Sequence, residues 1–351
     1  MLRQAITSEL EHAKWLRSEA RADLCAFTRR LAESCVGTCT ARAAAAEASG
    51  ADAPGLVAAA LALRDVGSAV SAPAKGDARR GRFGDSAFRP WFDWVAETGA
   101  RAVVSALLAE SDVAVGQEQA DEVAAYIAAS FGDRQRLDYG TAHETSFVVA
   151  LLCLVRLGVI SEALVDSGAV VKIVFAEYLR VCRLVQTTYS LEPAGSRGAW
   201  SLDDYQILPF ACGAAMHLDT LQDEARSDFV STDGTLECVE GSMFSESLVF
   251  TASAKTGAPF AETCPILHAL NGRPWRFIVN SVLGTYEREI IGKYVVARHI
   301  YFSSLFPATW QVKASAARRR ASDDAARRRP GDAHGSSGAT AAETPSPTTK
   351  L

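Results

Sequence analysis

The stretch that decides the fold is residues 136–157, RLDYGTAHETSFVVALLCLVRL. From position 145 onward its apolar residues follow one another as in a helix that is buried on most sides. Thr141 and Glu144 have the S/T-x-x-E spacing of a capping box, in which each side chain satisfies a free backbone N–H group at the helix start. The stretch therefore predicts a turn at Gly140 and a helix over 144–157.

Helical periodicity continues on both sides of this stretch. Leu24, Phe27 and Leu31, for example, fall three to four residues apart, as on one face of a helix. Strand-like alternation is scarce, and its best candidate is residues 293–302. The sequence therefore predicts an all-α fold. Further helices are expected over residues 9–34, 56–70, 100–111, 119–131, 168–189, 202–217 and 275–293.

Charge is distributed unevenly along the chain. Of its 36 basic and 41 acidic residues, residues 311–351 hold eight basic and four acidic ones. This tail has almost no large apolar residues, so we expect it to be disordered. Its arginine triplets at 318–320 and 327–329 fit a nuclear-import patch or a phosphate-seeking arm, but a solubilising low-complexity tail is the favoured interpretation. A second low-complexity segment, at about 40–81, is expected to be a linker with one embedded helix.

Composition excludes several classes of protein. The net charge of −5 gives no general attraction to nucleic acid or to anionic membranes. The longest apolar run, residues 147–155, is far shorter than the ~20 residues of a membrane helix, and residues 1–15 lack the apolar core of a secretory signal. Eight cysteines without a C-x-x-C pair indicate reduced, mostly buried thiols. We expect a cytoplasmic or nuclear protein that binds neither nucleic acid nor membranes.

The common catalytic motifs are absent from the sequence. Neither G-x-x-x-x-G-K-[ST] nor G-x-G-x-x-G occurs, and there is no G-x-S-x-G nucleophile elbow. His143 and Glu144 open an H-E-x-x-H frame, but Phe147 stands where the second zinc-ligating histidine belongs. The usual motifs of hydrolases and of nucleotide-binding folds are therefore excluded.

Residues 136–144 nevertheless combine the elements of an anion site. The start of the predicted helix presents free amide N–H groups and the positive end of the helix dipole, and Arg136 lies just upstream. Backbone donors and a guanidinium together suit a phosphate or a carboxylate. The same residues also fit a capped helix with a surface arginine, and His143 also fits a hydrogen-bonded structural histidine.

A second unusual segment is residues 191–205, LEPAGSRGAWSLDDY. One proline and two glycines make an irregular loop of it, and Trp200 offers an apolar face. Asp203 and Asp204 can hold a hard cation through oxygen ligands. Neighbouring carboxylates also suit the first turn of a helix for reasons of the helix dipole alone. Together, the two segments fit a magnesium–nucleotide clamp.

Five segments of the chain closely resemble the phosphotyrosyl phosphatase activator family. Members of this family are activators of protein phosphatase 2A and are also described as peptidyl-prolyl cis-trans isomerases. The resemblance covers residues 12–310, so that residues 1–11 form an N-terminal extension and 311–351 a separate tail. The segments are RFGDSAFRPWF (82–92), RLDYGTAHETSF (136–147), LEPAGSRGAWSLDDYQILPF (191–210), KTGAPFAE (255–262) and the surroundings of RHIYFSSLFP (298–307).

The resemblance implies an all-helical fold of core, linker and lid, with a cleft between core and lid that holds ATP with Mg²⁺. By matching position, the metal would lie at Gly198 and Asp204. The nucleotide would contact the chain from two sides: Arg136, Thr141 and Ala142 at the capped helix, and Val295, Arg298 and His299 opposite.

The chain departs from the family pattern at three of these positions. Ala142 stands where glycine is usual, Val295 where proline is common, and Arg298 where an uncharged polar residue is common. Arg298 would either strengthen a phosphate contact or crowd the cleft. Residues 255–286 match the lid surface that docks on the catalytic subunit of protein phosphatase 2A, and Glu262 is the best-matched contact.

The resemblance implies two linked activities. As an activator, the chain would act as a chaperone that uses ATP as a ligand shared with the phosphatase catalytic subunit. As an isomerase, it would grip a proline-containing peptide near Trp200, with Asp204 close by, and favour a twisted amide without any nucleophile. Two alternatives remain open: a phosphatase-binding module of the same fold with negligible isomerase activity, and a divergent paralogue that acts on another target.

Overall fold

The computed structural model describes residues 1–38, 53–71, 84–194, 202–203, 205–220, 223–254 and 258–310. The chain divides into two units, Met1–Thr309 and Trp310–Leu351, and all elements below belong to the first. The predicted tail, most of the predicted linker, and Gly198, Trp200 and Asp204 lie outside the described residues.

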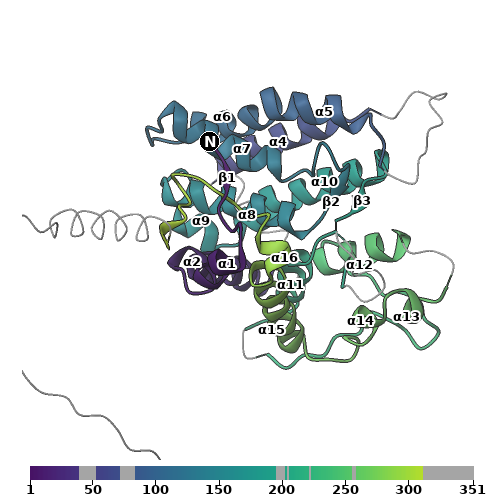
Figure 1. Ribbon diagram of the computed structural model, residues 1–351. Helices are drawn as coiled ribbons and strands as arrows, with labels where there is room; N and C mark the ends of the chain where they lie inside the picture. Colours follow the sequence, from purple (N-terminus) through teal and green to yellow (C-terminus); the bar gives the residue numbers. More distant parts are fainter. Residues whose placement is uncertain are drawn as a thin grey trace, which may run out of the picture. The chain divides into compact units, whose positions relative to one another are not determined.

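Within the described residues the fold is helical, with four strands of two residues each (Figure 1). Three π-helical turns adjoin α-helices without a break: η2 (Val95–Gly99), η3 (Val170–Phe175) and η5 (Tyr286–Ile291). The other helices are α1 (Glu9–Trp15), α2 (Glu19–Glu33), α4 (Pro54–Ser68), α5 (Phe88–Trp94), α6 (Ala100–Ala109), α7 (Gln117–Ala129), α8 (Thr141–Arg156), α9 (Glu162–Asp166), α10 (Ala176–Thr188), α11 (Leu208–Met216), α12 (Met243–Ala254), α13 (Phe260–Thr263), α14 (Pro265–His268), α15 (Trp275–Thr285) and α16 (Tyr294–Ala297).

The all-α prediction is confirmed, and most of the expected helices are present. The expected helix over 9–34 is broken because the Ser18 side chain accepts a hydrogen bond from the N–H of Arg21 and caps a new helix. Two expectations were wrong. The helix expected at 202 begins only at Leu208, and residues 293–302 contain the short helix α16 and only two strand residues.

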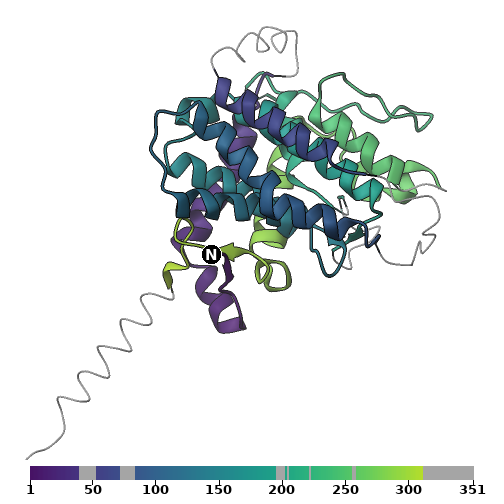
Figure 2. The same ribbon diagram turned by 90° about the horizontal axis from the view of Figure 1, so that it is seen from above.

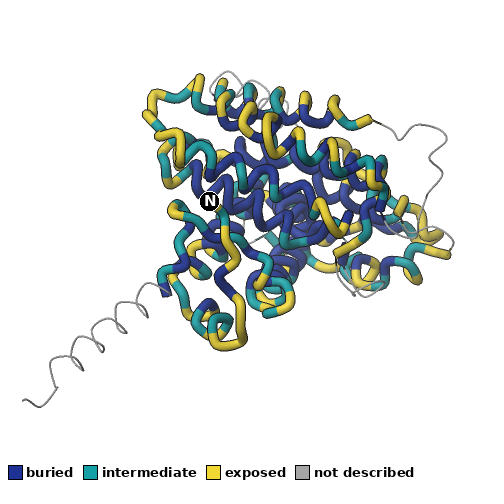
Figure 3. The backbone as a smooth tube through the Cα atoms, turned by 45° about the horizontal axis from the view of Figure 1, so that its top comes forward, coloured by how far each residue is buried: buried dark blue, intermediate teal, exposed yellow. Residues whose placement is uncertain are grey.

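The core is built around α8 and α11. Every residue of α8 from His143 to Leu154 is buried, and so is every residue of α11. Such helices have no solvent face, which explains their nearly continuous apolar sequence. Phe147 of α8 stacks on Tyr178 of α10 with ring centroids 3.8 Å apart. Buried backbone is concentrated in these inner helices, and exposed residues lie on the outer ones (Figure 3).

The colours of Figures 1 and 2 separate two groups of elements. Blue and teal helices from α4 to α10 pack together, with α4 in contact with both α6 and α10. The green helices α11, α12 and α15 also pack on one another, and α2 contacts α11. Two small sheets join distant segments: β1 (Arg3–Gln4) pairs antiparallel with β4 (Tyr301–Phe302), and β2 (Asp138–Tyr139) pairs in parallel with β3 (Glu192–Pro193).

Two expectations from composition can be compared with the described residues. All seven described cysteines are free, and five of them are buried, as expected. None of the helices in the described part combines the length and the apolar composition that crossing a membrane requires.

Candidate functional site

A cavity of about 760 Å³ opens at the start of α8. Its wall comes from the turn before β2, from the first turn of α8, from β3 with Ala194 and Asp203, and from the region of α16 and β4. Five of the six residues matched to a nucleotide contact lie on this wall: Arg136, Thr141, Ala142, Val295 and His299.

Gly140 allows the chain after β3 to pass close to the chain after β2. It does not make the expected turn, because its backbone is extended, with φ −168°. A Cβ atom at this position would lie 2.7 Å from the Cβ of Ala194. The backbone N–H of Ala194 donates to the carbonyl of Tyr139 at 2.6 Å, which continues the β2–β3 pairing. Glycine is therefore required by the close approach of the chain after β3.

Two non-glycine residues with left-handed backbone precede these strands. Leu137 has φ 57° and Ser190 has φ 48°. Left-handed geometry at a bulky residue such as Leu137 costs of order 1–3 kcal/mol and persists only where the surroundings enforce it. Here the carbonyl of Leu137 accepts a hydrogen bond from the N–H of Glu192 at 3.0 Å. The pairing of the two strands thus helps to hold Leu137 in this conformation beside the cavity.

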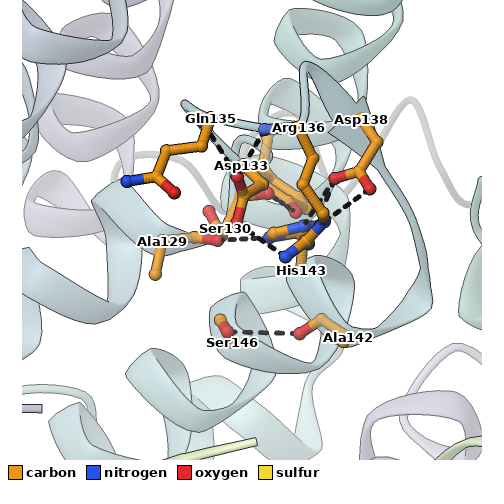
Figure 4. A network of polar contacts seen from close by, with 10 residues as sticks. Ala129, Ser130, Asp133, Gln135, Arg136, Asp138, Ala142, His143 and Ser146 are labelled. Carbon is orange, nitrogen blue, oxygen red and sulfur yellow. Dashed lines mark hydrogen bonds and ion pairs between the residues drawn. The ribbon is translucent and has the colours of Figure 1, made fainter. Parts of the chain in front are cut away.

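Arg136 is held by two carboxylates beside the cavity (Figure 4). Its Nε donates to Asp138 Oδ2 at 2.7 Å, and its Nη1 lies 2.9 Å from Asp133 Oδ2. Burial raises the pKa of Asp138, but contacts with His143 and Arg136 outweigh burial and leave that pKa below its ordinary value. The guanidinium is therefore fixed in position, with its charge partly compensated.

His143 is the hydrogen-bonded histidine that the sequence allowed. Its Nδ1 lies 2.8 Å from the carbonyl oxygen of Ala129 on α7, and its Nε2 lies 3.9 Å from Asp138 (Figure 4). The first contact ties α8 to α7. The second places the ring on the cavity wall, so His143 serves the structure and the site at once.

The predicted capping box is wrong. No side chain caps the start of α8, where Gly140 is the N-cap. Glu144 instead points away to α11, where its two oxygens accept the N–H groups of Ile207 at 3.2 Å and Leu208 at 3.1 Å. Burial raises the pKa of Glu144 to about 8, against the opposing effect of these two N–H groups. The first N–H groups of α8, at Thr141 and Ala142, are thus left without a side-chain cap at the cavity wall.

The alternative that placed Asp203 in the first turn of a helix is wrong, because α11 begins five residues later. It is 6% exposed and accepts hydrogen bonds from the N–H of Tyr205 at 2.7 Å and from Thr251 Oγ1 of α12 at 3.0 Å. It reaches the cavity wall. Among the described residues, no group of three His, Cys, Asp or Glu side chains is arranged to hold a metal.

The opposite wall is formed around α16. Burial, together with the positive charges of Arg136 and Arg298, holds the pKa of His299 below its ordinary value. Val295 is 61% exposed at the cavity mouth. Arg298 does not line the cavity, as far as the described residues show, and its guanidinium lies over the ring of Tyr294, 5.9 Å from the ring centroid.

Several wall residues escaped the sequence analysis. Gln4 and Tyr301 reach the cavity through the pairing of β1 with β4, which joins the two ends of the first unit. Glu192 lay in a recognised segment, but only its pairing with β2 shows that it faces the same space. One sequence signal could have found Lys293, which lies two residues before the matched Val295. Outside the cavity, Glu262 was matched to a partner contact by sequence, and the structure places it on α13 with its side chain exposed.

Comparison with solved structures identifies the fold. The crystal structure of the PP2A phosphatase activator Ypa1 superimposes with a TM-score of 0.60. It covers 84% of this chain and 91% of the Ypa1 chain, at 22% sequence identity. The helical fold is thus shared with the Ypa1 structure.

Comparison of sequences then gives the family. Residues 2–308 match the family described as phosphotyrosyl phosphate activator (PTPA) protein, and the chain belongs to this family. The serine/threonine-protein phosphatase 2A activator 2 of Eremothecium gossypii is 34% identical over 297 residues, which are 84% of this chain and 79% of that protein. The protein of the same name from Gibberella zeae is 37% identical over 65% of this chain, which spans only 51% of its length.

Proposed function

We propose that this protein activates the catalytic subunit of protein phosphatase 2A and that it does so with ATP and Mg²⁺ bound in the cavity at α8. Two relatives that match it over most of its length carry the name of phosphatase 2A activators, those of Eremothecium gossypii and Schizosaccharomyces pombe. The single observation that supports the nucleotide is the cavity of about 760 Å³ at an uncapped helix start. Its volume suits a ligand of that size, and helix N-termini favour phosphate.

The charge of the cavity supports a nucleotide that brings a cation with it. Among the described residues of its wall, Arg136 and Lys293 are basic, whereas four are acidic. A free polyphosphate would add negative charge to an already acidic wall. Mg²⁺ is usually held by one or two carboxylates together with substrate phosphates, so that a magnesium complex would relieve the repulsion. Asp204 and the backbone at Gly198 remain the proposed metal ligands. The acidic wall residues are Asp133, Asp138, Glu192 and Asp203.

In this proposal the residues of the chain bind and orient but transfer no group. The N–H groups at Thr141 and Ala142 and the fixed guanidinium of Arg136 hold the phosphates, and His299 closes the opposite wall. Bound ATP serves as a ligand between activator and phosphatase. Glu262 on the exposed helix α13 is the proposed phosphatase contact.

We further propose peptidyl-prolyl cis-trans isomerase activity, with the proline-containing segment bound near Trp200 and Asp204. The barrier to rotation about the peptide bond is ~18–20 kcal/mol, and it falls when a pocket binds the twisted amide more tightly than the planar one. This step needs no acid or base. A proline-peptide isomerisation assay with Trp200→Ala as the comparison tests it. An isomerisation rate equal to the uncatalysed rate would contradict this proposal and favour the alternative, a phosphatase-binding module with negligible isomerase activity.

The activator function is tested by restoring activity to inactive phosphatase 2A catalytic subunit with ATP and Mg²⁺. Arg136→Gln should lose most of this activation and most of the nucleotide affinity. Arg134→Gln is the matched control, because Arg134 lies in the same turn but pairs with Asp93 on the surface and is not on the cavity wall. Equal activation by both variants, with both folded by circular dichroism, contradicts the proposal.

A further inference from the structure

A groove runs between α4 and α10, away from the cavity at α8. We call it the α4–α10 groove and define it by Val57, Leu61, Arg64, Lys172, Arg180 and Leu184. It consists of two hollows, of about 520 Å³ and about 360 Å³, which share Arg64 and Arg180 and so are continuous. None of its lining residues lies on the wall of the α8 cavity. The two helices are in direct contact with each other (Figure 1).

The groove is lined by three exposed apolar side chains, two in the larger hollow and one in the smaller, which we call the apolar strip. Leu61 is 52% exposed, and Val57 and Leu184 are each 37% exposed. Val57 and Leu61 are four residues apart and therefore share one face of α4. The opposite face of α4 packs into the core, where Leu56 and Leu63 are buried. The exposed apolar residues are therefore not needed to pack this helix onto the fold.

Basic side chains border this strip. Across the larger hollow, four basic residues face two acidic ones. One of the acidic residues, Glu177, already pairs with two of the arginines, since its oxygens lie 2.8 Å from Arg180 Nε and 3.6 Å from Arg64 Nη2. Lys172 makes no ion pair with any described residue. The groove therefore carries a net positive charge, in contrast to the acidic body of the chain.

We propose that the α4–α10 groove docks an acidic amphipathic helix of a partner protein. Helices that bind in grooves place apolar residues at i, i+3, i+4 and i+7 against an apolar floor, and here Val57, Leu61 and Leu184 form that floor. Acidic residues beside the apolar stripe would face Lys172 and Arg64. The chain's own tail does not complement the groove, because residues 311–351 hold eight basic residues against four acidic ones.

The test measures fluorescence anisotropy of a labelled 18-residue peptide with Leu at i, i+3, i+4 and i+7 and Glu on its flanks. The full-length protein should bind it, and Leu61→Asp and Lys172→Glu should each weaken binding by about tenfold, or about 1.4 kcal/mol. Lys172→Glu is the sharper variant, because no ion pair within the described residues is lost. Leu10→Asp is the control, since Leu10 is 67% exposed on α1, outside the groove.

Three outcomes contradict the proposal. The first is equal affinity of the wild type and the two groove variants. The second is equal binding of a peptide in which Lys replaces every Glu, because this shows that apolar contacts alone determine the affinity and that charge does not contribute. The third is a concentration-dependent dimer in sedimentation that Leu61→Asp dissociates, which assigns the groove to a second copy of the chain. Loss of binding by the Leu10→Asp control also removes support, since it points to a site elsewhere.

Discussion

The carboxylate of Glu144 on α8 accepts the backbone N–H of Leu208, the first residue of α11, at 3.1 Å. The two residues are 64 positions apart in the sequence. Glu144 therefore caps the start of a helix other than its own and fixes the segment before α11, which carries Asp203 to the cavity. One buried contact thus joins two walls of the candidate site.

Replacing Glu144 should lower the free energy of unfolding, because the contact between α8 and α11 is lost. Glu144→Ala removes the acceptor of two buried N–H groups and should cost about 1–3 kcal/mol of unfolding free energy per group left unpaired, subject to non-additivity. Glu144→Gln keeps one acceptor oxygen and should cost less. Urea unfolding of the three proteins measures both values. An Ala variant as stable as the wild type would show that water or a rearranged side chain replaces the carboxylate.

The same residue predicts a pH dependence with a definite sign. Burial raises the pKa of Glu144 to about 8 in the folded protein, whereas an unfolded glutamate titrates near 4.3. The folded state therefore binds more protons between these values, and the contribution of Glu144 to stability is full below pH ~4.3 and falls as pH rises toward ~8. Glu144→Gln cannot ionise, so its stability relative to the wild type should rise from pH 5 to pH 8. A constant difference over this range contradicts the raised pKa.

Gly140 should not tolerate a side chain. The Cβ of Gly140→Ala would lie 2.7 Å from Ala194 Cβ, which must force β2 and β3 apart and should cost about 1–3 kcal/mol. Gly116→Ala is the matched control, because its nearest neighbour, Gln119 Oε1, is 3.6 Å away. Thermal unfolding should separate the two variants clearly. If they unfold together, the strands can part without loss and the close approach is not essential.

Nucleotide binding should depend on pH through His299. Its pKa is lowered by burial and by Arg136 and Arg298, so the free protein holds a neutral ring at pH 7. An anion in the cavity would stabilise the charged ring and raise that pKa, and by linkage the affinity should increase as pH falls from 7.5 to 6. Calorimetric titration with Mg-ATP at several pH values measures this change in affinity. His299→Gln should flatten the dependence relative to the wild type, with the ionisation of ATP common to both proteins.

Thiol reactivity should single out one described cysteine. Cys238 is exposed, whereas burial raises the pKa of Cys153 to about 12 and that of Cys25 to about 11. Because the thiolate is the reactive form, a thiol reagent at pH 8 should modify Cys238 rapidly. Cys39 lies outside the described residues, so Cys39→Ser is the background for the experiment. Rapid modification of Cys153 in the native protein would show that α8 is not buried in solution.

The sequence predicted the helical elements well where local chemistry decides them. The periodic apolar residues of α6 and α7 place these helices to within a few residues. The serine caps of α2 and α9 were not recognised, although each is a contact with a residue only three positions away. It failed between 202 and 207, where acidic residues looked like a helix start. Asp203 is used instead for a contact with Thr251 on α12, 48 residues away, which no local pattern reveals.

By itself, the sequence determined the helical class, the family and the two segments on which the candidate site depends, because periodicity and motifs are properties of neighbouring residues. Only the tertiary structure decided what those segments do together. The pairing of β2 with β3, the close approach at Gly140 and the meeting of Gln4 with His299 on one cavity wall all depend on contacts between distant residues. Such contacts form when burial of the whole core outweighs the entropy of bringing the chain together.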